Sequence, residues 1–254
     1  MARLPRRLGH GEEATLGEHL EELRQRLFVI LGSIVIATIV AFIFHTRLLD
    51  WLNRPLPSGH RRLLATGVAE PFTVSIAVSL YAAVVISSPV ILWQLWSFFA
   101  PAVDPSSERK VLALVAFAVI LGGAGLAFGY WVLLPRAIHF LTNYDSRHFI
   151  HLIKASTYYS FVVTVLLGIV VVFQLPLVVL GLVSLGVFSS RSLRRHRRIG
   201  YFVTAVIALA LPGPDPVTTF LELLPMWALF EGSIWLAVLF ERRQAVTKTV
   251  QHAP

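Results

Sequence analysis

The sequence predicts an all-α membrane protein with six transmembrane helices. Two observations carry this prediction: the 254-residue chain is 56% hydrophobic but only 14% charged, and its apolar residues gather into six runs. A soluble domain carries about 25% charged residues, so much of this chain does not meet water. A transmembrane helix needs roughly 20 apolar residues, and six of them leave little room for a separate soluble domain.

The six runs are joined by short polar connections. They cover residues 27–44, 71–103, 111–135, 155–190, 199–211 and 217–240. The second run is longer than one perpendicular span, which predicts a tilted or broken helix with a kink at Pro89, because proline removes a backbone hydrogen bond. The fifth run reaches only about 20 Å against a hydrocarbon core of roughly 30 Å. Residues 212–216 then force a turn, so spans five and six are expected to form a short hairpin.

Glycines in the third run predict close helix packing. Gly125 and Gly129 form a GxxxG pair, and small residues let helices approach each other in lipid. This motif is common, so it indicates packing and carries no functional information.

The positions of Lys and Arg predict the orientation. If the N-terminus lies inside, the inner segments contain roughly twice as many Lys and Arg residues as the outer segments. Both termini are therefore expected to be cytoplasmic. The chain divides into an amphipathic N-terminal segment (1–26), a six-helix transmembrane domain (27–240) and a cytoplasmic tail (241–254). No cleavage site follows the basic start, so we expect the N-terminus to be retained.

Charge and cysteine content narrow the function classes. The net charge of +8 is typical of cytoplasmic loops here, and no basic-aromatic module for nucleic acid is present. The absence of cysteine excludes disulfides and thiol catalysis. Ser, His and acidic residues form no catalytic order, so we expect no enzyme, no metal site and no cofactor.

Acidic residues before the first span form a candidate binding site. Thr15 and Glu18 match a capping box, which predicts a helix running into that span, with Glu18 and Glu22 on one face. The simpler interpretation is an amphipathic helix with solvated carboxylates. Carboxylates beside an anionic leaflet are disfavoured, which favours a site for a basic ligand instead. Glu108 in the first inner loop is a second such carboxylate, and it can also cap the third span.

Polar residues at membrane depth are further candidates. Gln174, Asp215, Glu222 and Glu231 lie in or beside the last three apolar runs. An ionisable group there costs about 2.5–3.5 kcal/mol, so each is a functional hypothesis by default. One alternative function is a proton-coupled small-solute transporter that uses Glu231 and Gln174. Another is an intramembrane hydrolase, but Asp215 has no second embedded Asp for a dyad.

Several segments, taken in order, resemble one family. They are HLEELRQRL (19–27), TGVAEPF (66–72), SPVILWQLWSFFAP (88–101), Glu108-Arg109, Tyr130 with Pro135, residues 212–219, and LPMWALFE (224–231). This pattern, over roughly residues 15–241, resembles the TatC family, the large subunit of the twin-arginine protein translocase. No single motif would be specific, but the ordered set is.

The resemblance implies a receptor in the plasma (inner) membrane. The family binds signal peptides carrying two consecutive arginines on its cytoplasmic face, and Arg pairs with carboxylates in a bidentate way that Lys does not match. The implied binding residues are Glu22, Glu108, Arg24, Arg109 and His19. The implied partners are single-span TatA- and TatB-type subunits, signal peptides of folded precursors, the bilayer and further copies of the chain, with transport drawing on the proton gradient.

The resemblance also implies polar contacts to partners inside the membrane. The residues are Gln174, Asp215, Thr219 and Glu231. At Gln174 the chain departs from the family, which often has Glu there. A neutral amide does not titrate, so we expect no proton carriage at this position, although the amide can hydrogen-bond a partner helix.

Overall fold

The structure is a computed structural model that describes residues 16–57, 63–99, 108–144, 152–210 and 216–251. Within these ranges the chain is helical, and one isolated bridge, between Leu64 and Lys154, is the extended pairing. The elements are α1 (Leu16–Ile43), α2 (His45–Asn53), α3 (Glu70–Phe99), α4 (Glu108–Phe128), the π-helix η3 (Gly129–Leu133), α5 (Leu134–Asn143), α6 (Ala155–Val172), α7 (Leu175–Ser184), α8 (Ser190–Arg195), α9 (Arg197–Ala210) and α10 (Pro216–Gln251). The predicted all-α fold is confirmed for this part of the chain.

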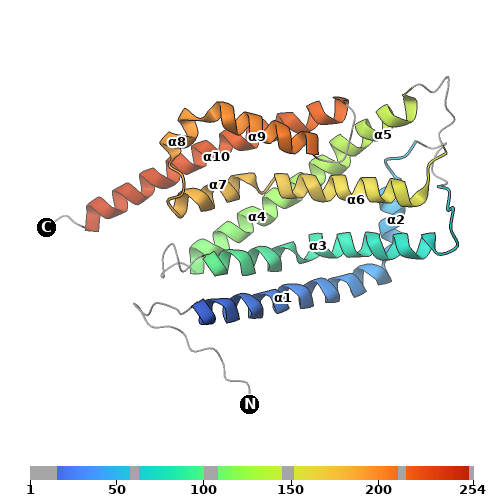
Figure 1. The fold of residues 1–254 in the computed structure, drawn as a ribbon, viewed down its shortest axis with the longest axis horizontal. Helices are drawn as coiled ribbons and strands as arrows, with labels where there is room; N and C mark the ends of the chain where they lie inside the picture. The colour runs from blue at the N-terminus through green and yellow to red at the C-terminus, as the bar shows by residue number, and fades with distance from the viewer. Residues whose placement is uncertain (1–15, 58–62, 100–107, 145–151, 211–215, 252–254) are drawn as a thin grey trace, which may run out of the picture.

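The long helices lie side by side, and α4–η3–α5 crosses them diagonally (Figure 1). α1 packs chiefly on α3, α3 also contacts α4 and α6, and α10 contacts α7 and α9. One end of the bundle, here called the α8 end, holds α8, the start of α1, the end of α3, the start of α4 and the end of α10 (Figure 1). The opposite end, the α2 end, holds α2 and the starts of α3 and α6.

Five helical stretches of the described chain are long and apolar enough to cross a membrane. They are Leu20–Ile43, Glu70–Phe98, Leu112–Asn143, Ala155–Ser184 and Pro216–Leu239. The chain is therefore a multi-pass membrane protein. α9 has 14 residues and rises about 21 Å, which is too short for an ordinary span, as the fifth apolar run predicted. It lies beside α10, and the pair ends before the α2 end is reached (Figure 1).

Prolines lie inside two of the long helices, and the kink expected at Pro89 stays a prediction. α3 continues as one helix through Pro89, and α10 continues through Pro225, so the second span is not broken there. The interruption lies instead in the fourth span, between α6 and α7, at Phe173 and Gln174. Pro176 is the second residue of α7, where its missing N–H has no helical partner to lose.

No helix end falls at the two domain boundaries expected from the sequence. α1 runs from Leu16 to Ile43 across residue 26, and α10 runs to Gln251 across residue 240. The N-terminal segment and the first span thus share one helix, as do the last span and the start of the tail.

The GxxxG glycines face α6, which confirms the predicted packing. A Cβ atom at Gly125 would lie 2.8 Å from Cγ of Phe173, and one at Gly129 would lie 2.8 Å from Cγ2 of Ile169. Side chains at these two positions would push α4 and η3 away from α6.

Two tyrosines hold the C-terminus of α2 against the core. The Tyr130 hydroxyl donates to the Trp51 carbonyl at 2.8 Å, and the Tyr158 hydroxyl donates to the Leu52 carbonyl at 2.7 Å. The last four carbonyls of a helix lack helical partners. The Tyr158 hydroxyl satisfies that of Leu52, whereas the Trp51 carbonyl also accepts from the Arg54 amide at 3.2 Å. The Tyr130 ring also stacks on the Trp51 ring, with centroids 3.8 Å apart.

A buried carboxylate joins α3 to α6 at the α2 end. Glu70 accepts from the Thr66 amide at 2.7 Å and from the Ser156 amide at 3.0 Å. The bridge between Leu64 and Lys154 lies beside it, with the Leu64 amide donating to the Ile153 carbonyl at 2.9 Å. Both helix N-termini therefore receive negative charge, which their dipoles favour.

Candidate functional site

Glu22 lies on α1 at the α8 end, with its side chain 42% exposed. Arg26, one helical turn further on, donates to Glu22 Oε1 through Nε at 3.1 Å and also through Nη2. Residues four apart share one face of a helix, so the sequence places these two groups together. The predicted acidic side chain is therefore present at the helix start and is paired with an arginine of the same chain.

Arg26 also reaches across to the end of α3. Its Nη1 donates to the Gln94 carbonyl and its Nη2 to the Ser97 carbonyl, each at 3.2 Å. Its guanidinium carbon lies 6.0 Å from the centre of the Phe98 ring. α3 ends at Phe99, so the guanidinium faces the negative end of that helix. Arg26 thereby fixes the position of Glu22 relative to α3.

Sequence reasoning missed Arg26. Its position four residues after Glu22 was the available signal, but its other partners come from α3 and leave no trace in the local pattern.

The other predicted binding residues are placed as follows. Arg24 is exposed and pairs with Glu21 at 3.4 Å, beside the Phe28 ring, so the structure does not bring it to Glu22. The backbones of His19 in α1 and of Glu108 and Arg109 in α4 lie in helices at the α8 end (Figure 1). Their side chains lie outside the described residues.

Gln174 sits at the interruption between α6 and α7 and faces α4. Its Nε2 donates to the Ala118 carbonyl at 3.2 Å, and a Cβ at Gly122 would come within 3.2 Å of the same nitrogen. Its Oε1 is buried without a hydrogen-bond partner. A buried acceptor left unpaired is costly, so this amide is a polar group held inside the bundle against its own preference for water.

Glu231 contacts two residues of α9, a tyrosine and an arginine. The Tyr201 hydroxyl donates to Oε1, and Arg197 Nη2 lies 3.5 Å from Oε2. Glu231 also lines a cavity of about 420 Å³ together with Tyr201, Trp227 and Ala228. The carboxylate expected at membrane depth therefore joins α9 to α10 and borders an opening on their surface.

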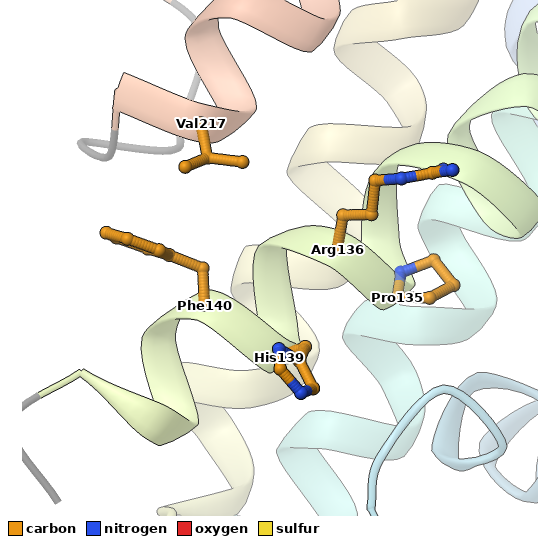
Figure 2. Close-up of a pocket in the computed structure, with 5 residues that line it drawn as sticks. All are labelled: Pro135, Arg136, His139, Phe140 and Val217. Carbon is orange, nitrogen blue, oxygen red and sulfur yellow. The ribbon is translucent and has the colours of Figure 1, made fainter.

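The remaining predicted polar residues lie near the start of α10. Thr219 is half-buried and Glu222 is buried, and both engage in polar contacts. Asp215 lies outside the described residues. Nearby, a second cavity of about 420 Å³ opens between α5 and α10, where Val217 of α10 lies across from Phe140 and His139 of α5 (Figure 2). Arg136 of this cavity donates to the Val132 carbonyl of the preceding η3 at 3.0 Å.

These features define a multi-pass helical membrane protein with a partly buried pair, Glu22 and Arg26, at the end of the bundle where several helices begin or end. In the described part of the chain, no three His, Asp or Glu side chains gather as metal ligands.

Comparison with known proteins places the chain in a family. The profile of the Sec-independent protein translocase protein (TatC) matches residues 18–225. The chain belongs to the TatC family, whose members are protein translocase components. It is 34% identical to TatCd of Bacillus subtilis over 242 residues, which cover 95% of this chain and 99% of that protein. It is 33% identical to the chloroplastic TATC of Arabidopsis thaliana over 91% of this chain and 68% of that protein.

Solved structures agree with this assignment. A crystal structure of the "Twin Arginine Translocase Receptor- TatC in DDM" superposes with a TM-score of 0.77 at 29% identity, covering 87% of this chain and 99% of that one. A second crystal structure of the same receptor gives a TM-score of 0.75 at 30% identity. The family assignment favours protein translocation over the small-solute transporter and the intramembrane hydrolase.

Proposed function

We propose that this protein is the receptor core of a twin-arginine protein translocase. It binds twin-arginine signal peptides at the α8 end and nucleates the assembly that exports folded proteins. One observation carries the proposal: the partly exposed carboxylate of Glu22 is held beside the end of α3 by Arg26. The two structural relatives, described as twin-arginine translocase receptors, support it.

The chemistry of the site suits a pair of arginines. A carboxylate accepts two parallel N–H bonds from a guanidinium, which a point-charged ammonium cannot reproduce. In our proposal Glu22 receives one arginine of the signal and Glu108, at the start of α4, receives the other. His19, Arg24 and Arg109 complete the site as donors to the peptide backbone.

Substitution of two carboxylates at opposite ends of the bundle tests this assignment. Glu22→Gln should weaken crosslinking of a twin-arginine peptide about ten-fold, because a charge-assisted bond is lost. Asp50→Asn removes the same charge from an exposed position of α2, away from the proposed site, so it serves as the matched control. A twin-lysine peptide that crosslinks as well as the twin-arginine one, or equal effects of the two substitutions, would contradict the recognition mechanism.

We further propose that the α8 end is cytoplasmic and that α9 is the fifth of six crossings in the plasma membrane. The start of α1 and the end of α10 lie at this end, and so does a cluster of exposed arginines (Figure 1). The cluster comprises Arg191, Arg194, Arg195 and Arg198. Such residues are retained on the cytoplasmic side.

The absence of native cysteine makes this topology easy to test. Thr46→Cys lies exposed in α2 and Arg194→Cys lies exposed in α8. A membrane-impermeant maleimide added to intact cells should label the first and not the second. Labelling of Arg194→Cys before lysis would reverse the orientation.

Single-span subunits are proposed to dock on the surface of α9 and α10. The cavity bordered by Glu231 and Ala228 supports this, because a carboxylate lines an otherwise largely apolar opening. Gln174, Asp215 and Thr219 are proposed as further polar contacts to partners or to a second copy. Ala228→Trp would fill the opening and should reduce co-purification of TatA- and TatB-type subunits. Ala77→Trp, on an exposed position of α3, is the matched control.

A further inference from the structure

The carboxylate of the proposed site already holds a guanidinium. Arg26 donates to Glu22 Oε1 through Nε and Nη2, two nitrogens on one edge of its planar group. Both nitrogens donate to this one oxygen, so Arg26 uses the paired edge of its guanidinium that an incoming arginine would also present to the carboxylate. A signal peptide therefore meets a Glu22 that is engaged with an arginine of the receptor itself.

Arg26 is anchored more firmly than Glu22. Its side chain is 20% exposed against 42% for Glu22, and it keeps bonds to the carbonyls of Gln94 and Ser97 that do not involve Glu22. The Gln94 side-chain oxygen adds a contact at 3.5 Å from Nη1. If Glu22 turned toward a peptide, Arg26 would still face the negative end of α3. The exchange therefore breaks the bonds between Arg26 and Glu22 and leaves those between Arg26 and α3 in place.

We propose that Arg26 is the resting occupant of Glu22 and that the signal arginine displaces it. The inference rests on the proposed receptor function and adds an internal competitor to it. A competitor lowers the affinity of every cationic peptide by the same factor, because each must first break the same pair. For a pair of this exposure the factor is about two to five. Arg26 thus sets how strongly a peptide must bind, while Glu22 decides which cation binds best.

The test measures peptide binding to the full-length protein in lipid nanodiscs. Arg26→Gln keeps an amide donor for the α3 carbonyls but removes the competing charge. It should tighten binding of a labelled twin-arginine peptide about two- to five-fold, and tighten a twin-lysine peptide by the same factor. Arg26→Lys keeps the charge without the two-nitrogen contact and should give a smaller gain. Arg47→Gln removes an arginine that lies over the Phe44 ring beside α2 and should leave both affinities unchanged.

A double-substitution cycle separates competition from charge alone. In a Glu22→Gln background, Arg26→Gln should give no gain, because the pair no longer exists. A gain that persists there would show general electrostatic repulsion and overturn the inference. Weaker or unchanged binding of both peptides in Arg26→Gln, with wild-type binding intact, would overturn it as well and leave the receptor function standing. Absence of wild-type binding to the twin-arginine peptide would overturn the receptor function and the inference together.

Discussion

Replacing Tyr158 by Phe should measurably loosen the protein at the α2 end. The substitution removes one hydroxyl and leaves the ring, so packing around it changes little. The lost bond joins the Tyr158 hydroxyl to the Leu52 carbonyl at 2.7 Å, and both residues are buried. A buried carbonyl that loses its partner costs about 1–3 kcal/mol. If the free energy of unfolding falls by about 2 kcal/mol, the melting temperature of a protein of this size should fall by roughly 4–8 °C.

The measurement is thermal unfolding of the purified protein in one detergent. Tyr144→Phe removes a hydroxyl from an exposed tyrosine and should shift the melting temperature by less than about 1 °C. Tyr130→Phe should destabilise less, since the Trp51 carbonyl keeps the Arg54 amide as a donor at 3.2 Å. The double variant should lose less than the sum, because both bonds hold the same helix end. If Tyr158→Phe melted with the wild type, the capping role assigned to these tyrosines would be wrong.

Three further outcomes follow from the packing. Gly125→Ala should destabilise the protein by about 1–3 kcal/mol in the same melting assay, because the new Cβ would lie 2.8 Å from Phe173. The control Gly123→Ala meets nothing within 4 Å and should be neutral or stabilising. Equal melting temperatures of the two variants would contradict the close approach of α4 to α6. Gln174→Leu should change stability by less than about 1 kcal/mol, since it removes one bond and one unpaired acceptor together, yet it should reduce export of a twin-arginine reporter; full export would argue against Gln174 as a contact site. Glu70→Ala should speed hydrogen exchange at the start of α6, measured by mass spectrometry, because the Ser156 amide loses its acceptor, while exposed Asp50→Ala should leave that exchange unchanged.

Much of the fold follows from composition and spacing, but the helix interruptions do not. The short α9 and the glycines facing α6 were predictable, because length and residue size act locally. Pro89 lies inside α3, which continues through it, while the helix is interrupted just before Pro176. A proline inside a helix frees one carbonyl, but whether the helix continues depends on neighbours that come from other parts of the chain.

The acidic residues of the candidate site could be predicted from the sequence, but their hydrogen-bond partners could not. Residue type and position singled out Glu22 and Glu231. The partners that fix them were missed, since Arg26 binds α3 carbonyls 68 and 71 residues away and Tyr201 reaches Glu231 across 30 residues. Such pairings depend on which helix faces lie together. A mostly apolar helix has several faces that could pack, so the sequence does not show which one does.

The spacing of the contacts made by Arg26 has a consequence for biogenesis. Its carboxylate partner precedes it by four residues, whereas its carbonyl partners on α3 follow 68 and 71 residues later. At a synthesis rate of about 5–20 residues per second, several seconds separate the emergence of α1 from that of the end of α3. During that interval Glu22 is at hand to neutralise an arginine at the membrane boundary. Arg26 can therefore pair with Glu22 as soon as α1 is synthesised, and its bonds to the α3 carbonyls form afterwards.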